Sequence, residues 1–278
     1  MRTFLILMAL FAAATSHAQT TVRVVRLVES SDAVPVFHVW GGQPVVLALE
    51  VAATDPGLKA SVRANVYQLA GAIAAPSSKD VPVAEKLSFE HSLAHLKNWR
   101  WSAPAVRHPT VFELRFAAQS NDGGDWKPAG SARLIAYPAD LGAQLKDLAT
   151  AARANGAGRL AVFGASTDLK TAFRDLSIPF EDVGEALPDE MEPSSIYIGQ
   201  CSRAQLDSIV SQARFKGRLM IFANDPTQPP GVYRTDSSGS SVTKVTLPLL
   251  LDLAHSPQKQ TALLSLLQHA FQTPKNTP

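Results

Sequence analysis

The stretch that decides the fold is residues 131–163, SARLIAYPADLGAQLKDLATAARANGAGRLAVF, because the spacing of its apolar residues changes twice. Up to Tyr137 the composition is typical of a β-strand. From 140 to 154 apolar residues recur at helical spacing, and Asn155-Gly156 ends that pattern. The run Arg159–Phe163 then has the short apolar character of a buried strand. We therefore expect a boundary after Tyr137 between a strand-rich part and a part in which strands alternate with helices.

The part before this boundary, residues 20–138, consists of short runs rich in β-branched and aromatic residues, separated by turn-forming Gly, Pro, Asp and Asn. Val62, Ala64 and Val66 alternate with polar residues, which is the pattern of a strand with one buried face. The strands expected here lie at 21–28, 34–39, 44–52, 60–69, 111–117 and 131–137. Such a series of short strands predicts an immunoglobulin-like β-sandwich.

The part after the boundary, residues 139–273, alternates short apolar strands with amphipathic helices, and residues 274–278 form a tail. The strands expected here lie at 159–163, 178–183, 195–199 and 218–223, followed by a hairpin of 231–235 and 241–247. The helices expected here lie at 140–154, 167–176, 203–216 and 259–271. This alternation predicts a mostly parallel sheet with helices on its faces. The expected fold class is therefore α+β with two domains, a sandwich followed by a flavodoxin-like three-layer α/β domain.

The segment Arg159–Ala223 resembles the front half of the class I glutamine amidotransferase-like domains, which have a flavodoxin-like fold. In those enzymes a nucleophilic Cys follows the strand that matches 218–222, whereas residues 223–226 here read Ala-Asn-Asp-Pro. A catalytic His-x-Glu is also expected, but His255 is followed by Ser-Pro. The resemblance therefore implies a degenerate domain without amidotransferase chemistry. The same Gly-turn strand and the late hairpin also resemble small periplasmic regulators of diguanylate cyclases.

The first 18 residues, MRTFLILMALFAAATSHA, have the three-part layout of a secretory signal peptide. Arg2 precedes an apolar run over Phe4–Ala14, and Ser16 and Ala18 occupy the −3 and −1 positions of a cleavage site. We expect a periplasmic or secreted protein after cleavage near Ala18. Cys201 is the only Cys, so an intrachain disulfide is excluded.

Composition excludes two classes of partner. The chain has 26 Lys and Arg against 24 Asp and Glu, and its basic residues are scattered, so nothing indicates nucleic-acid binding. After the leader no segment reaches the length of a membrane-spanning helix, so we expect no membrane span in the mature chain. Neither a cofactor nor a metal is assigned, because no motif for either is present.

Polar residues cluster where the carboxyl ends of the predicted parallel strands would meet, the usual ligand site of open α/β sheets. The candidate ligand-binding residues are Gly164, Ser166, Asp168, Gln200, Cys201, Ser202, Asn224 and Asp225. One interpretation is a pocket that holds a small anion at helix N-termini. The other is that Ser166, Thr167 and Ser202 are helix N-caps and the glycine serves a turn.

Three further sets of residues have two interpretations each. Cys201, before a predicted helix, is either a thiolate nucleophile or a buried thiol. His91 and His95, with His108 nearby, are either metal ligands or incidental residues of a solvated loop. Trp99 and Trp101 would lie on one face of a strand. With Trp40 and Trp126 they either form an exposed row that stacks on sugars or on a partner's side chains, or fill the core.

These observations lead to one expected function and two alternatives. We expect an exported, non-catalytic accessory or binding protein of the cell envelope, whose sandwich faces an envelope protein or a glycan. No catalytic residue is assigned. The alternatives are a hydrolase or transferase that uses Cys201 or Ser166, and a periplasmic regulator that senses a small ligand.

Overall fold

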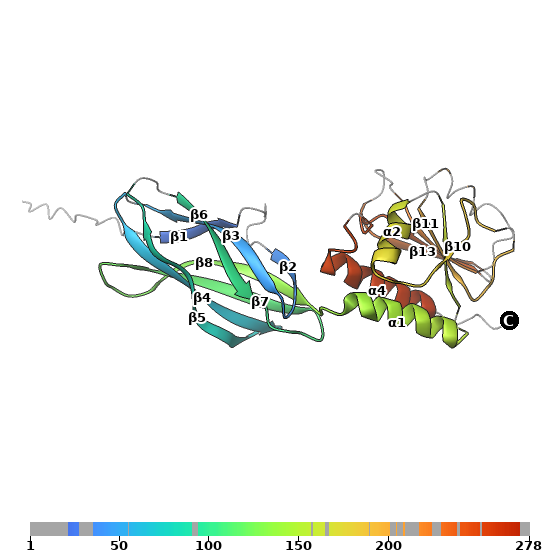
Figure 1. Ribbon diagram of the computed structural model, residues 1–278, viewed down its shortest axis with the longest axis horizontal. Helices are drawn as coiled ribbons and strands as arrows, with labels where there is room; N and C mark the ends of the chain where they lie inside the picture. Colours follow the sequence, from blue (N-terminus) through green and yellow to red (C-terminus); the bar gives the residue numbers. More distant parts are fainter. Residues whose placement is uncertain are drawn as a thin grey trace, which may run out of the picture.

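The computed structural model places a sandwich of strands beside a sheet that carries helices (Figure 1). It describes residues 22–27, 36–54, 56–90, 94–156, 158–164, 167–188, 190–200, 204, 208, 217–223, 229–237, 240–250 and 252–272. The predicted signal peptide lies outside these residues. The predicted helix over 203–216 also lies outside them, except for Ala204 and Ser208, which are helical. No helix within the described ranges combines the length and the apolar character that a membrane crossing needs.

Two sheets form the sandwich. The three-stranded sheet has the order β1 (Val22–Leu27), β3 (Pro44–Ala53) and β6 (Ala94–Ser102). The five-stranded sheet has the order β2 (Val36–Trp40), β8 (Lys127–Tyr137), β7 (Thr110–Ser120), β4 (Lys59–Ala70) and β5 (Ile73–Ser88). β2 pairs with β8 in parallel, and all other neighbours in these two sheets pair antiparallel. This division of strands between two sheets is compatible with the immunoglobulin-like part of the prediction.

A single apolar core lies between the two sheets and follows from the alternation in the sequence. Val62 of β4 and Leu114 of β7 point inward and are buried, while their chain neighbours point outward. Trp99 and Trp101 of β6 are also buried, and their rings stack with centroids 6.1 Å apart and planes at 19°. The interpretation of these two tryptophans as core residues is therefore confirmed.

Two strands of the sandwich, β5 and β6, have no counterpart among the predicted strands. Pro76 and Pro82 in β5 are typical of turns, yet β5 is an edge strand, where a residue without a backbone N–H is tolerated. The pairing of β5 with β4 shifts register at several points, and Asp80 and Lys86 adopt positive φ values of 54° and 52°. β5 is therefore a bulged edge strand, which periodicity alone does not reveal.

The second part of the chain is built on a six-stranded mixed sheet. Its order is β10 (Glu181–Asp182), β9 (Leu160–Phe163), β11 (Ile196–Gln200), β12 (Gly217–Phe222), β14 (Ser240–Val245) and β13 (Val232–Ser237). The first five strands of this order pair in parallel, and β13 pairs antiparallel with β14 at the edge. β9, β11 and β12 are almost wholly buried, as expected for short apolar strands in the middle of a sheet.

The helices of the described part pack on one face of this sheet. They are α1 (Leu141–Ala154), α2 (Thr167–Asp175) and α4 (Pro257–Gln272). Leu145 of α1, Phe173 of α2 and Leu263 of α4 share one core with Val162 of β9 and Ile198 of β11. All three helices therefore cover the same side of the strands.

The opposite face of the sheet has a different cover in the described part of the chain. The buried cluster on this face, which includes Phe163 and Tyr197, packs against Val183, Leu187 and Met191 from the connection after β10. A three-layer domain needs helices on both faces, and strands dominate the described chain. The predicted fold class, with its flavodoxin-like α/β domain, is therefore wrong. Periodicity gives the apolar stripe of each helix but not the face of the sheet that it covers.

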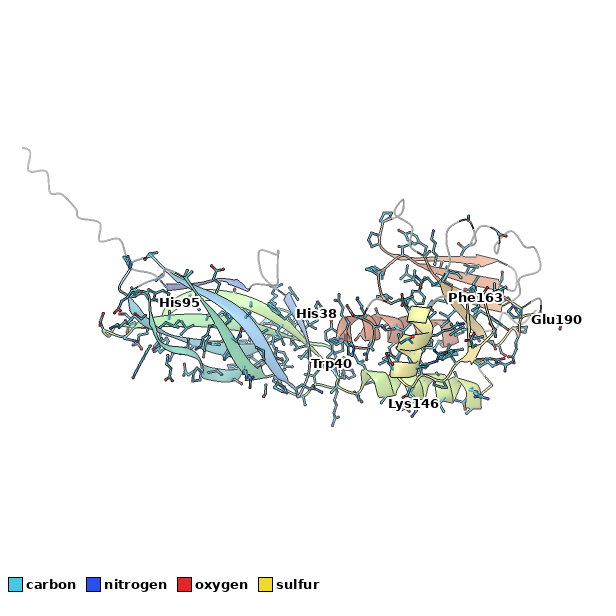
Figure 2. The ribbon with its side chains drawn as sticks, turned by 45° about the horizontal axis from the view of Figure 1, so that its top comes forward. His38, Trp40, His95, Lys146, Phe163 and Glu190 are labelled. Carbon is cyan, nitrogen blue, oxygen red and sulfur yellow. The ribbon has the colours of Figure 1, made fainter. Side chains whose placement is uncertain are left out.

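The sandwich and the second sheet meet at β2 and the end of β8. Val39 of β2 packs against the sandwich core, whereas Trp40 and Ile135 pack against the core that holds the helices. Tyr137, the last residue of β8, is buried in that same core, and its Oη lies 2.8 Å from Nδ1 of His38. Figure 2 labels His38 and Trp40 at this junction. Side chains on the outer side of two neighbouring strands thus join the two parts.

Candidate ligand-binding groove

Three of the eight residues predicted to bind a ligand at the strand ends are described. Gly164 follows β9 and Gln200 ends β11, and a Cβ at position 164 would lie 3.3 Å from the carbonyl oxygen of Gln200. These two residues are therefore neighbours, whereas Asp168 is exposed in the first turn of α2. The other five residues lie outside the described part of the chain: Ser166, Cys201, Ser202, Asn224 and Asp225.

The described residues at these strand ends have structural partners. Gly164 adopts a φ of 93°, and its N–H donates to the carbonyl of Gly184 at 2.9 Å, which is a turn role. Asp182 of β10 accepts a hydrogen bond from Nζ of Lys170 at 2.7 Å. That hydrogen bond holds the pKa of Asp182 below its ordinary value. A ligand site at this edge remains a prediction.

The sequence allows two roles for the histidines of the sandwich, metal ligands or residues of a solvated loop. His95 lies in β6 rather than in a loop, and its Nε2 is 2.7 Å from the carbonyl oxygen of Ser88. Its ring packs edge-on against Phe89, with centroids 5.0 Å apart. His91 lies outside the described residues. Among the described side chains, no three His, Cys, Asp or Glu residues lie close enough together to share a metal ion.

The outer face of the five-stranded sheet is polar and hollowed. The alternation that buries Val62 turns Arg63 and Tyr67 of β4 outward, and Arg115 of β7 likewise points outward. A hollow of about 620 Å³ lies over β4, β5 and the β7–β8 connection. A second hollow of about 560 Å³ lies over β4, β7 and β8. Together we call them the groove.

The two hollows share a wall. The first is lined by residues that include Ser61, Asp80, Lys86 and Asn121, and the second by residues that include Asn65, Tyr67, Glu113 and Arg115. Arg63 and Trp126 line both. The guanidinium carbon of Arg63 lies 4.0 Å from the centroid of the Trp126 ring, within the range of a cation–π contact. This stacked pair divides the groove.

Arg63 also binds a carboxylate. Its Nη1 lies 2.7 Å from Oδ1 of Asp80. Asp80 reaches this position because the bulged strand β5 places it at a φ of 54°, and its N–H donates to Oδ1 of Asn65 at 2.9 Å. The Nε of Arg63 is buried and has no hydrogen-bond partner among the described residues. A non-glycine residue in the left-handed region and an unpaired buried donor thus lie together at one wall of the groove.

A second set of three residues repeats this chemistry in the second hollow. The guanidinium carbon of Arg115 lies 4.4 Å from the centroid of the Tyr67 ring. Its Nε and Nη2 donate to Oε2 of Glu113 at 2.9 Å and 2.6 Å. The hydrogen bond that Arg115 donates to Glu113 raises the pKa of the guanidinium. Each hollow therefore has an arginine that stacks on an aromatic ring and binds a carboxylate.

The two sets lie side by side because of the register between β4 and β7. Arg63 is opposite Ala117 and Asn65 is opposite Arg115, so the two arginines are diagonal neighbours on one face. The sequence shows polar residues at 61–67 and 113–115, typical of a solvated face. It does not show that Trp126 covers one of them. The signal that could have pointed to one side of the groove is a tryptophan in a turn rich in Asn, Asp and Gly, 11 positions after Arg115.

Comparisons with known proteins leave the chain without a family. No protein-family model matches it, and no curated protein does. A search of solved structures gives matches with low overall similarity, and the matches described below are not glutamine amidotransferase-like domains.

Three of these matches show how different the matched proteins are. A Niemann-Pick type C2 protein from the Japanese carpenter ant is 7% identical with a TM-score of 0.27, over 43% of this chain and 89% of that chain. The third ScaB cohesin of R. flavefaciens is 8% identical with a TM-score of 0.22, over 44% of this chain and 96% of that one. A family 123 glycoside hydrolase from Clostridium perfringens is 6% identical with a TM-score of 0.25, over 85% of this chain and 52% of that one. Similarity at this level carries no functional argument.

Proposed function

We propose that this chain is a non-catalytic binding protein whose sandwich holds a glycan in the groove. The observation that carries the proposal is the pair of arginine, carboxylate and aromatic sets on one sheet face. The first set is Arg63, Asp80 and Trp126, and the second is Arg115, Glu113 and Tyr67. Both sets line hollows rather than a flat surface.

A glycan suits this chemistry better than an ion or an apolar molecule. Sugar rings present C–H faces that pack on aromatic rings, and hydroxyl groups that both donate and accept hydrogen bonds. Trp126 and Tyr67 offer aromatic surface, while the arginine and carboxylate groups offer donors and acceptors side by side. Because each guanidinium is matched by a carboxylate, the paired groups carry no excess charge and favour a neutral ligand.

Binding rather than reaction is supported by the partners of the two carboxylates. Asp80 forms an ion pair with Arg63, and Glu113 forms one with Arg115. An arginine does not give up its proton in proteins, so neither pair is suited to proton transfer. The groove is therefore arranged to hold polar groups in fixed positions.

We propose that the protein binds its glycan outside the cytoplasm. Residues 1–18 have the layout of a signal peptide, and cleavage near Ala18 would release a periplasmic or secreted protein. In that compartment the protein would meet the glycans of the cell envelope. Mass spectrometry of the protein recovered from the cell exterior or the periplasm should give an N-terminus at Gln19. Recovery of the intact leader from the cytoplasm would contradict export.

A glycan array followed by isothermal titration calorimetry tests the binding proposal. We expect the purified chain to bind at least one neutral glycan, and both Arg63→Ala and Trp126→Ala to weaken that binding at least tenfold. Arg174→Ala is the matched control, because Arg174 also lies over an aromatic ring, Phe180, at 5.9 Å but outside the groove. A blank array would overturn the proposal, and so would full binding by both groove variants.

A further inference from the structure

We propose that the two hollows are subsites of one continuous site, and that the ligand is an oligosaccharide that crosses the Arg63–Trp126 pair. This inference rests on the proposed function and adds the length of the ligand and its path. A single sugar would occupy one hollow only. An oligomer that reaches both would contact both arginine sets at once.

The hollows follow one another along β4. Ser61 lines the first hollow and Tyr67 lines the second, and both side chains point outward from the same strand. The two residues are six positions apart, which corresponds to about 20 Å along an extended strand. That span exceeds the size of one sugar ring. Occupation of both hollows by one ligand therefore requires a chain of several sugars.

The dividing pair belongs to both hollows. Arg63 and Trp126 line each of them, so the same two side chains border both spaces. Trp126 follows Gly123 and Gly124, which have positive φ values of 103° and 108° and nothing within 4 Å of the position a Cβ would take. The ring is thus attached to an uncrowded connection rather than to the middle of a strand.

Arg63 supplies the second, independent observation. Its Nε is buried and has no partner among the described residues, while its Nη1 is held by Asp80. An unpaired buried donor costs free energy, so this arginine is held in place at a cost. Although Nε itself is closed to solvent, 28% of the Arg63 side chain is exposed and can meet a sugar that lies across the pair. Arg63, which lines both hollows, is therefore the point where the ligand crosses from one hollow to the other.

In the first hollow, a second residue of β5 with a positive φ is held by a side chain of β4. Lys86 also adopts a positive φ, 52°, and its N–H donates to Oγ of Ser61 at 3.3 Å. Side chains of the outward row of β4, Asn65 and Ser61, thus fix both left-handed residues of β5, Asp80 and Lys86. Since β5 is bulged at these points, it directs Asp80 and Lys86 into the groove.

Linkage of the two subsites has a measurable consequence. When one ligand occupies two sites, the second contact is intramolecular, and affinity rises without any new kind of contact. We expect an oligosaccharide that spans both hollows to bind at least about 100-fold more tightly than its monosaccharide. Affinity should rise with length until both hollows are filled and then stay constant.

Calorimetry with a length series tests this, using the glycan that the array selects, from one to six sugars. Lys86→Asn alters only the first hollow and keeps a residue that tolerates positive φ, and Tyr67→Ala alters only the second. We expect each variant to reduce the affinity of the longest ligand at least tenfold and to flatten the length dependence. Arg174→Ala should leave the series unchanged.

The outcomes separate the two proposals. If glycans bind but a monosaccharide is as tight as the hexasaccharide, or only one of the two hollow variants weakens the hexasaccharide, this inference is wrong and the proposed function stands. If no glycan of any length binds, the proposed function fails and this inference fails with it. A thermal melt equal to that of the unmodified chain shows that each variant is folded.

Discussion

The ring of Phe163 occupies the space that a side chain at Gly199 would need. The two residues are direct partners on the parallel strands β9 and β11, and a Cβ at position 199 would lie 2.3 Å from Cζ of the ring. Real Cβ atoms do not approach that closely, so the glycine and the phenylalanine depend on each other. The packing of this face of the second sheet therefore rests on the absence of a side chain in β11.

We expect Gly199→Ala to lower the free energy of unfolding by about 1–3 kcal/mol, because the methyl group forces the Phe163 ring out of its position. Urea denaturation followed by circular dichroism measures the change. The double variant Gly199→Ala with Phe163→Leu should recover part of the loss. A single variant as stable as the unmodified chain would show that the ring moves freely.

The control for this prediction is a glycine with room around it. A Cβ at Gly142 in the first turn of α1 would meet Cδ2 of Leu176 at 3.5 Å, an ordinary contact. Alanine is a better helix former than glycine, so Gly142→Ala should raise stability by up to about 1 kcal/mol. If Gly199→Ala lowers the free energy of unfolding and Gly142→Ala raises it, the space around each glycine, rather than the loss of a glycine as such, determines the change in stability.

Arg218 connects the second sheet to the end of α4. Its Nη1 donates to the carbonyl oxygen of Ala270 at 2.8 Å, and its Nη2 donates to the carbonyl oxygen of Ser194. Burial lowers the pKa of this guanidinium. We expect Arg218→Ala to cost about 1–3 kcal/mol of stability, since two carbonyls lose their donor. Urea denaturation should show this loss, whereas Lys146→Ala, at an exposed position of α1, should be close to neutral; equal effects would contradict the bridging role.

His38 makes the stability of the junction depend on pH. Burial lowers the pKa of His38 below its ordinary value of 6.5, so the folded chain binds a proton at this site less readily than the unfolded chain. The contribution of neutral His38 is therefore fully present above pH 6.5 and is lost as the pH falls toward the lowered pKa. We expect the Tm to decrease between pH 7.5 and pH 5.5 by more in the unmodified chain than in His38→Gln.

The comparison of the two chains removes the contribution of the other titrating groups. Tyr137 is the ionisable partner that lies within hydrogen-bond distance of His38, and burial raises its pKa, so its hydroxyl stays protonated over this range. Differential scanning calorimetry at four pH values gives the two curves. Parallel curves would show that His38 does not titrate differently on folding.

Local pattern predicted most of the strands and helices but not their layers. The strand expected at 60–69 is β4, and the helix expected at 140–154 is α1, because each depends on the spacing of its own apolar residues. β5 was missed because its prolines and serines are typical of turns, and only its edge position makes them acceptable. The fold class was wrong because the face that a helix covers depends on chain connections.

The groove was beyond sequence reasoning for a related reason. Arg63 and Arg115 are 52 positions apart in the sequence, and Trp126 lies further along, in the connection between β7 and β8. Only the register between β4 and β7 and the bulges of β5 bring these side chains to one face. The ligand-binding residues predicted at the strand ends of the second sheet were chosen by a general rule for parallel sheets. That rule gives the location of a site but says nothing about the hydrogen-bond partners of the residues there.

Trp101 and Trp126 of the sandwich have different positions, so their substitution should have different effects on stability. Trp101 is 8% exposed and packs against Trp99 and Phe112, so Trp101→Ala should lower stability by about 3–5 kcal/mol through the cavity that it leaves. Trp126 lies half-buried over Arg63 at the surface of the groove, so Trp126→Ala should cost less than about 1 kcal/mol. Urea denaturation of both variants measures the contrast. If the two losses were equal, Trp126 would be a core residue, and the loss of glycan binding in its variant would reflect unfolding rather than a missing contact.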